Sequence, residues 1–117
     1  MINYATYKHE TMPDVLVIEA SGKLDTTTAD FMLDCIQGYI EHGDKKVVID
    51  CEDLNIITSV GLGMLVRANK RMKESGGAIA IANAQGLVAD SLRLVHFDRL
   101  FGLHPSIDDA AASLKSD

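Results

Sequence analysis

The sequence predicts an α/β fold with a single mixed β-sheet of about four or five strands and about four helices. Short runs of branched apolar residues, typical of buried strands, alternate along the chain with segments whose apolar residues recur at helical spacing. The length of 117 residues fits one domain spanning 1–117, and 47% hydrophobic residues are enough to bury one core.

The first two strands are predicted at residues 2–9 and 15–20, close enough in sequence to form a hairpin. The first carries Tyr and Thr residues that favour strands, and the second is a nearly continuous apolar run. Pro13 fixes its own φ angle in the turn at 11–14. Residues 21–22 are expected to end the second strand.

A helix follows, and three residues before it are possible N-caps, because their side-chain oxygens can accept from free amides: Asp25, Thr26 and Thr27. Four apolar residues then fall on one helical face: Met32, Cys35, Ile36 and Tyr39. Gly43 is a natural left-handed C-cap. The third strand, at 46–51, has a continuous apolar centre, which predicts burial on both faces of the sheet.

The connection at 52–58 is expected to be anchored in the core by its apolar residues, Leu54, Ile56 and Ile57. A second helix is predicted from 60 to 74 and ends at the small residues 75–77. Its expected inward face consists of Leu62, Leu65, Val66 and Met72. Its expected solvent face consists of Arg67, Lys70, Arg71 and Lys73.

The C-terminal part is predicted to add a strand at 78–82, a helix at 85–95, a short edge strand at 101–103 and a last helix. The small residues of 78–82 indicate that another element packs closely over this strand. The helix at 85–95 is expected to face the core with Val88, Leu92 and Val95. Ser106 is the expected N-cap of the last helix, followed by Asp108 and Asp109 in its first turn. The inward face of that helix is expected to be Ile107, Ala110, Ala111 and Leu114.

Composition argues against several classes of protein. The net charge of −6, together with three Phe, three Tyr and no Trp, disfavours binding to nucleic acid. The first residues lack a charged segment followed by an apolar one, and no apolar run is long enough for a membrane span, so we expect a cytoplasmic protein without a signal peptide that does not insert into membranes. The charge suits a partner with a basic surface, or simply keeps the chain soluble.

The chemistry-bearing side chains are too dispersed to predict a metal site, a cofactor or an enzyme. Cys35 and Cys51 lie in apolar periodic segments and are expected to act as small buried hydrophobes in a reducing compartment. The four histidines lack clustered metal-ligand spacing: His9, His42, His96 and His104. Four carboxylates stand without a nucleophile beside a base: Asp25, Asp50, Glu52 and Asp53.

The stretch from 58 to 63 is the most informative motif. Thr58 or Ser59 can cap the helix, while Gly61 and Gly63 allow another backbone to approach closely. On these residues alone, a capped and tightly packed helix is the favoured interpretation over a functional site. The two glycines lack the third glycine of a dinucleotide fingerprint, so nucleotide binding is weakly supported.

Three segments in register resemble the STAS domain, the fold of bacterial anti-sigma-factor antagonists. The run 47–54 is similar to the central strand and turn of that family, and 59–63 is similar to the small-residue start of its second helix. The Gly-Lys-Leu-Asp of 22–25 resembles the family's segment before helix one. The resemblance implies a non-enzymatic regulator that docks on an anti-sigma factor or serine kinase-like protein through the loop and helix at 58–72.

In regulated members of the family, a hydroxyl just before the glycine is phosphorylated by the partner kinase, which ends the tight complex. Val60 occupies that position here and Thr58 replaces a preceding Asp, so the usual switch cannot operate at residue 60. Ser59 or Thr58 is the remaining candidate for phosphorylation. The resemblance implies a partner-binding surface made of Asp25, Thr58, Ser59, Val60, Gly61, Leu62 and Gly63.

Two other functions stay open. The chain is alternatively an STAS subunit of a larger assembly, such as a stressosome-like or lipid-transporter complex. It is alternatively a domain that senses a small ligand or a nucleotide. A homodimer is compatible with each of these interpretations.

Overall fold

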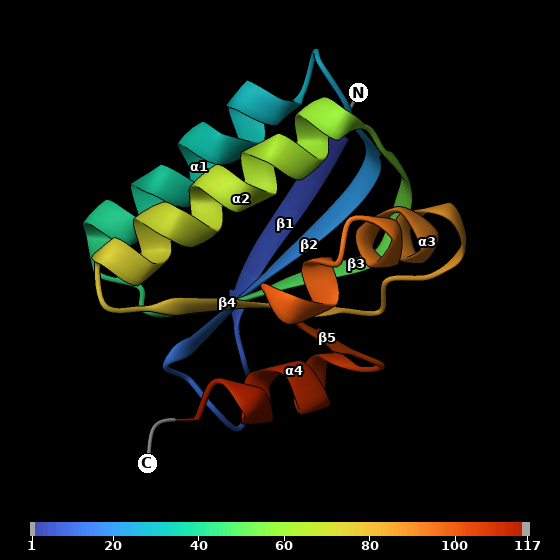
Figure 1. The fold of residues 1–117 in the computed structure, drawn as a ribbon. Coiled ribbons are helices and arrows are strands. Elements are labelled where there is room, and N and C mark those ends of the chain that lie inside the picture. Colours follow the sequence, from blue (N-terminus) through green and yellow to red (C-terminus); the bar gives the residue numbers. More distant parts are fainter. Residues whose placement is uncertain (1, 116–117) are drawn as a thin grey trace.

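A computed structural model describes residues 2–115 of the chain. The strands are β1 (Ile2–Lys8), β2 (Val15–Leu24), β3 (Lys46–Ile57), β4 (Ala78–Ala82) and β5 (Gly102–His104). The helices are α1 (Ala29–His42), α2 (Ser59–Glu74), α3 (Gly86–Leu94), the 3-10 turn η1 (Phe97–Arg99) and α4 (Ile107–Ser113). Figure 1 shows α1 and α2 running side by side above the sheet, with α4 below it.

The strands form one five-stranded mixed sheet in the order β1-β2-β3-β4-β5. β1 and β2 are an antiparallel hairpin, and the other neighbouring pairs are parallel. The predicted α/β class, the hairpin, the strand at 78–82 and the edge position of the last strand are confirmed. Parallel neighbours need crossover connections, and the helices between β2 and β5 supply them.

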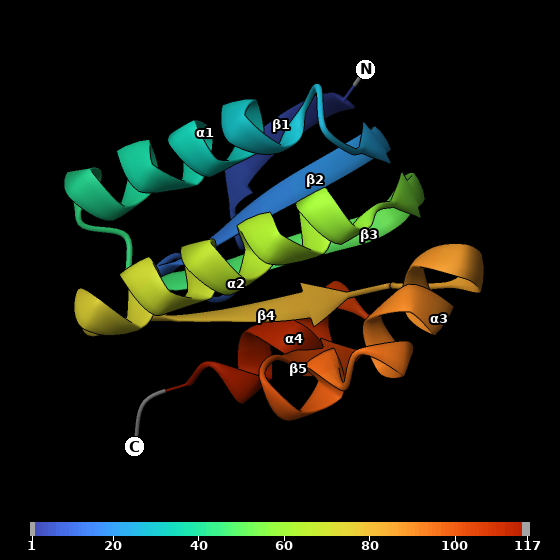
Figure 2. The same ribbon diagram turned by 45° about the horizontal axis from the view of Figure 1, so that its top comes forward.

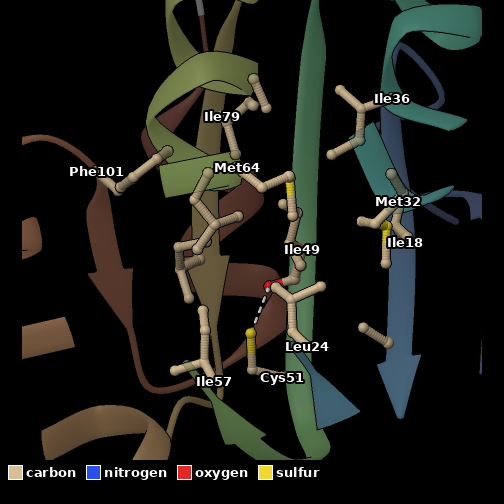
Figure 3. Close-up of a cluster of buried hydrophobic side chains, with 14 of the residues drawn as sticks. Ile18, Leu24, Met32, Ile36, Ile49, Cys51, Ile57, Met64, Ile79 and Phe101 are labelled. Atoms are coloured by element: carbon tan, nitrogen blue, oxygen red, sulfur yellow. Dashed lines mark hydrogen bonds between the residues drawn. The ribbon is translucent and has the colours of Figure 1, made fainter. Parts of the chain in front are cut away.

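The sheet separates two hydrophobic clusters. The larger cluster lies between the sheet and α1, α2 and α3, and Figure 3 shows Ile18, Ile49 and Met64 within it. The smaller cluster lies between the sheet and α4, where Ala80 and Ala82 pack with Ala110 and Ala111. The expectation that small residues in the strand at 78–82 allow close packing is therefore confirmed. Val47, Val48 and Ile49 are all buried because successive side chains of β3 enter opposite clusters.

Two strands are longer than predicted. β2 continues past residues 21–22 to Leu24, and β3 continues past residue 51 through most of the expected connection. The two extensions pair with each other through two register shifts, so the pairing continues past the glycine and the polar residues with local irregularities. Leu54 and Ile57 are buried as expected, whereas Ile56 is exposed. The boundaries of the two edge strands differ from the prediction by one residue: β1 ends before His9, and β5 begins after Phe101.

Several helix boundaries and faces also differ from the prediction. Thr28, and not one of the three residues before it, is the N-cap of α1, and it makes no side-chain capping bond. Val66 and Val95 are exposed, because α2 buries the smaller Ala68 and Asn69 and α3 already ends at residue 94. Leu62 is half-buried. The turn η1 was not expected; the tilted pair of Phe97 and Phe101 rings stabilises it.

The predicted C-cap of α1 and the expected burial of Cys51 are confirmed, whereas Cys35 is less buried than expected. Gly43 adopts a left-handed φ of 105° and ends α1. Cys51 is buried and Cys35 half-buried, and the Cys35 thiol donates to Tyr4 Oη at 2.9 Å. Within residues 2–115, no helix is long and apolar enough to cross a membrane.

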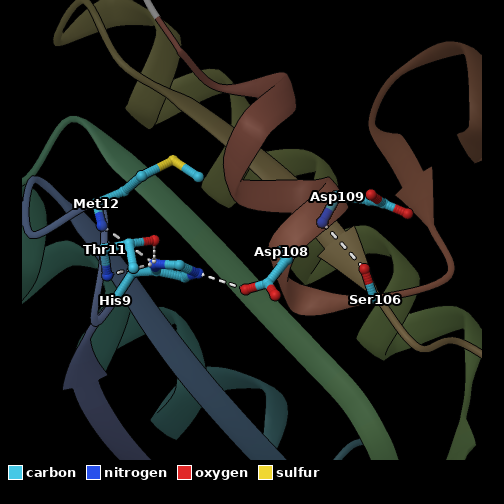
Figure 4. Close-up of polar contacts among 6 residues, drawn as sticks. All are labelled: His9, Thr11, Met12, Ser106, Asp108 and Asp109. Atoms are coloured by element: carbon cyan, nitrogen blue, oxygen red, sulfur yellow. Dashed lines mark hydrogen bonds and ion pairs between the residues drawn. The ribbon is translucent and has the colours of Figure 1, made fainter.

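A histidine joins the β1–β2 turn to α4, as Figure 4 shows. Ser106 caps α4 as predicted, because its side chain accepts from the amide of Asp109 at 3.0 Å. His9 is buried, and its Nδ1 accepts from the amides of Thr11 and Met12, each at 3.2 Å. Nε2 therefore carries the proton and donates to Asp108 Oδ1 at 2.8 Å. We call this set of contacts the His9 clasp.

Candidate functional site

Two of the three segments that carried the family resemblance, 22–25 and 59–63, meet at one end of the sheet. Leu24 ends β2 and Ile57 ends β3, and these residues are paired in the parallel register. The loop before α1 and the start of α2 leave the sheet from these neighbouring positions, and Figure 2 shows both at the same end of the molecule. The main-chain amide of Thr58 donates to the Leu24 carbonyl at 3.0 Å, which fixes one segment against the other.

Thr58 starts α2. Its backbone is extended, and its hydroxyl oxygen accepts from the amide of Gly61 at 3.4 Å, so Thr58 rather than Ser59 is the N-cap. The same hydroxyl lies 3.5 Å from the Leu24 carbonyl, to which it donates. Thr58 is therefore half-buried and held from two sides, while Ser59 is exposed.

Gly61 and Gly63 have different surroundings although they share one helix. A Cβ placed on Gly61 would lie 2.6 Å from the Leu24 carbonyl oxygen, closer than real Cβ atoms approach. Gly61 is buried, and its missing side chain lets α2 lie against the end of β2. A Cβ on Gly63 meets none of the described residues within 4 Å, and Gly63 is exposed. Only Gly61 fulfils the predicted close approach of two backbones.

Asp25 organises the neighbouring loop. Its Oδ1 accepts from the Thr27 amide at 3.0 Å, the Thr27 hydroxyl at 2.8 Å and the Thr28 hydroxyl at 3.2 Å. These hydrogen bonds, led by the one from the Thr27 side chain, lower the pKa of Asp25 and favour its ionised form. Asp25 thus shapes the loop and does not cap α1. Asp25 is half-buried as a residue and directly follows Leu24, whose carbonyl accepts from the Thr58 amide.

The outer surface of the site is small and largely uncharged. Ser59, Val60 and Gly63 are exposed on α2, and 41% of the Val60 surface is accessible. Leu62 lies half-buried on the side of the same turn. Within the described residues, no group of three or more His, Cys, Asp or Glu side chains is placed to hold a metal ion. Ser59, Val60 and Gly63 therefore form a small, mostly uncharged exposed surface at the start of α2.

The site includes features that sequence motifs did not indicate. The Leu24 carbonyl joins the two segments through a main-chain hydrogen bond, and such a bond cannot be predicted from residue types. Thr28 was also missed, although its hydroxyl donates to the Lys23 carbonyl at 2.8 Å and accepts from the Asp25 amide at 2.9 Å. Its position in a run of three threonines gave no means of separating it from its neighbours.

A family model for the STAS domain matches residues 6–110. The chain belongs to the STAS domain family. An anti-sigma F factor antagonist of Paenibacillus polymyxa is 27% identical over 101 residues, which cover 86% of this chain and 84% of the relative. The chain is thus an STAS domain similar in sequence to an anti-sigma factor antagonist, and the resemblance inferred from its motifs is confirmed.

Solved structures of STAS proteins share the fold. An anti-sigma factor antagonist from Mycobacterium paratuberculosis has a TM-score of 0.86 at 23% identity, covering 99% of this chain and 96% of that chain. The phosphorylated form of the Bacillus cell fate determinant SpoIIAA has a TM-score of 0.69 at 15% identity, covering 95% and 100%. The mixed sheet with its helices is therefore the fold of these antagonists.

Proposed function

We propose that this STAS domain is a cytoplasmic, non-enzymatic regulator that docks on an anti-sigma factor through the surface around the start of α2. The observation that carries the proposal is that the family-like segments 22–25 and 59–63 meet on this surface, where the Thr58 amide donates to the Leu24 carbonyl. Docking surfaces benefit from such rigidity, because little conformational entropy is lost on binding. The named relative, an antagonist of an anti-sigma factor, supports the class of partner.

The proposed contact surface consists of the exposed residues Ser59, Val60 and Gly63, with Leu62 and Asp25 at its margin. Gly61 and Thr58 support this surface from inside, because Gly61 is buried against Leu24 and the Thr58 hydroxyl caps α2. Val60 gives the partner an apolar contact at the position where a phosphorylated hydroxyl would otherwise stand. Binding of the partner to this surface would therefore not be controlled by phosphorylation of residue 60.

If the partner kinase modifies this domain, we expect Ser59 to be the acceptor. The Ser59 side chain is exposed, whereas the Thr58 hydroxyl is engaged with Gly61 and Leu24. A phosphate on Ser59 would add about −1.5 to −2 charges to a nearly neutral contact surface and should weaken docking. Intact-mass spectrometry with peptide mapping, on protein from its native cells, tests this: phosphate on Thr58 would contradict the assignment.

The function itself is tested by capture of partners from native lysate with the tagged chain, followed by mass spectrometry. We expect enrichment of a protein whose sequence contains the ATP-binding elements of a serine kinase-type anti-sigma factor. Enrichment of transporter subunits or of other STAS proteins, without such a protein, would instead support membership of a larger assembly. A nucleotide that stays with the purified chain through size exclusion would support the sensing alternative.

A further inference from the structure

The side of the sheet that faces α4 is only partly covered. α4 packs mainly against β3, β4 and β5, so β1 and the second half of β2 stay open on this side. Ala5 and Tyr7 of β1 and Glu19 of β2 are exposed. Ala5 pairs with Glu19, and Glu19 pairs with Asp50 of β3. These three residues therefore form one row across neighbouring strands, and their side chains project from the same side of the sheet.

Two hollows adjoin on this open area. One, of about 240 Å³, is lined in part by Glu19 and Asp50. The other, of about 390 Å³, lies between Tyr7 and the first turn of α4. Asn83 lines the second hollow and donates to Asp50 Oδ1 at 2.9 Å, so the two hollows meet at this pair. Among the described residues that line them, none is Lys or Arg and five are carboxylates, which we call the acidic face: Glu10, Glu19, Asp50, Asp53 and Asp108.

Asp50 is the buried member of the acidic face, and one of its oxygens has no donor. Only 5% of the residue is exposed. Its Oδ1 accepts from Asn83 Nδ2 and, at 3.2 Å, from the Glu52 amide. No donor among residues 2–115 reaches Oδ2, which is not fully enclosed and is therefore reachable from the smaller hollow. A largely desolvated carboxylate oxygen without a donor is unfavourable, and a donor supplied by a ligand would stabilise it.

The charges of the acidic face also repel one another. Glu19 and Asp50 stand side by side on neighbouring strands, and like charges in such positions destabilise a sheet. Tyr7 lies on the same side of the sheet, because it pairs with Val17 of the cluster between the sheet and α4. Burial, and then the charges of Glu19, Asp50 and Asp108, raise the pKa of the Tyr7 hydroxyl. A cation beside Tyr7 would therefore be attracted by several carboxylates and would relieve their repulsion.

We propose that the acidic face binds a basic segment of a partner protein, with an arginine of that segment placed between Tyr7, Glu19 and Asp50. A guanidinium group carries its donors in a planar fork, so it can bond two carboxylates at once and lie against an aromatic ring. A metal ion fits less well, because within the described residues no three His, Cys, Asp or Glu side chains converge to hold one. This surface lies on the opposite side of the sheet from α2, and the inference does not depend on docking at the start of that helix.

Isothermal titration calorimetry of the chain with an oligo-arginine peptide at low salt tests the proposal. We expect binding that Glu19→Gln weakens about fivefold or more, because one of the two carboxylates that hold the guanidinium group becomes neutral. Tyr7→Leu should weaken it about threefold, because the aromatic ring beside the cation is lost. Asp90→Asn is the matched control: it removes one negative charge from an exposed residue of α3 and should keep the dissociation constant within about twofold of wild type.

Two further measurements separate this site from diffuse attraction to an acidic chain. Glu19→Gln should melt at a temperature no lower than wild type, because it removes the repulsion between residue 19 and Asp50. An oligo-lysine peptide of equal length should bind about threefold or more weakly, because an ammonium group cannot form the planar fork. No binding of the arginine peptide, equal weakening by Glu19→Gln and Asp90→Asn, or equal affinity for the lysine peptide would overturn the proposal.

Discussion

At the scale of single residues, the contact between Gly61 and the Leu24 carbonyl decides how close α2 comes to the sheet. The hydrogen bond from the Thr58 amide ends on the same carbonyl oxygen. The backbone of β2 is therefore held by α2 at the point where the loop of Asp25 begins. A shift of α2 away from Leu24 would separate the two halves of the proposed docking surface.

This contact predicts opposite effects of the same substitution at two glycines. Gly61→Ala should lower the free energy of unfolding by about 1–3 kcal/mol, because its methyl group would overlap the Leu24 carbonyl. Gly63→Ala should raise it by about 0.5–1 kcal/mol, because alanine favours the helix and the described residues leave its methyl group free space. Urea unfolding measures both. Equal effects of the two substitutions would mean that the close approach of α2 to β2 does not restrict the side chain at position 61.

The buried Cys51 thiol should make the folded chain less stable as the pH rises into the alkaline range. Burial, with a smaller contribution from the charge of Asp50, raises the pKa of this thiol from 9.0 to about 12. The unfolded chain then loses the proton first, so the contribution to stability is complete below pH 9.0 and is lost as the pH rises towards 12. Urea unfolding at several pH values should show a steeper loss of stability above pH 9.0 for wild type than for Cys51→Ala. Parallel pH profiles would contradict the assignment.

At the scale of elements, the strands and helices of the core were predictable, and their extensions were not. The strand at 78–82 matches its prediction because its apolar run is bounded by glycine and asparagine. The second half of β3 was missed because exposed polar residues interrupt its apolar pattern, while pairing with β2 sustains it. Val95 was assigned to the core because helical periodicity cannot show that α3 ends one residue earlier.

The His9 clasp connects the β1–β2 turn to α4, and His9→Ala tests it. The two amides that donate to Nδ1 would lose their acceptor, so we expect a loss of about 1–3 kcal/mol in the free energy of unfolding. His9→Asn keeps an acceptor near the position of Nδ1 and should retain part of the stability. Asp108→Asn should have a much smaller effect, because the Asp108 side chain is 85% exposed. An Asp108→Asn loss equal to that of His9→Ala would place the stabilisation in the hydrogen bond between His9 and Asp108 instead.

At the scale of the whole molecule, the sheet places two chemically different surfaces on one chain. The proposed docking surface lies where β2 and β3 end, and the exposed Leu87 and Leu94 lie on α3, the helix between β4 and β5. The family motifs indicated the first surface because short glycine-containing segments are readable in sequence. The contact between these segments through Leu24 emerged only from the paired register of β2 and β3. The prediction for the helix at 85–95 covered only its inward face, so Leu87 and Leu94 received no assignment.

The central claim is that an anti-sigma factor binds the exposed start of α2. The most direct test is isothermal titration calorimetry of the captured anti-sigma factor with the wild-type chain and two variants. Gly63→Trp adds a large side chain to the proposed contact surface, and Glu10→Trp adds it to the exposed turn after β1. We predict that Gly63→Trp raises the dissociation constant about tenfold or more, and that Glu10→Trp leaves it unchanged. Wild-type affinity for Gly63→Trp would contradict the claim that this surface is the docking site.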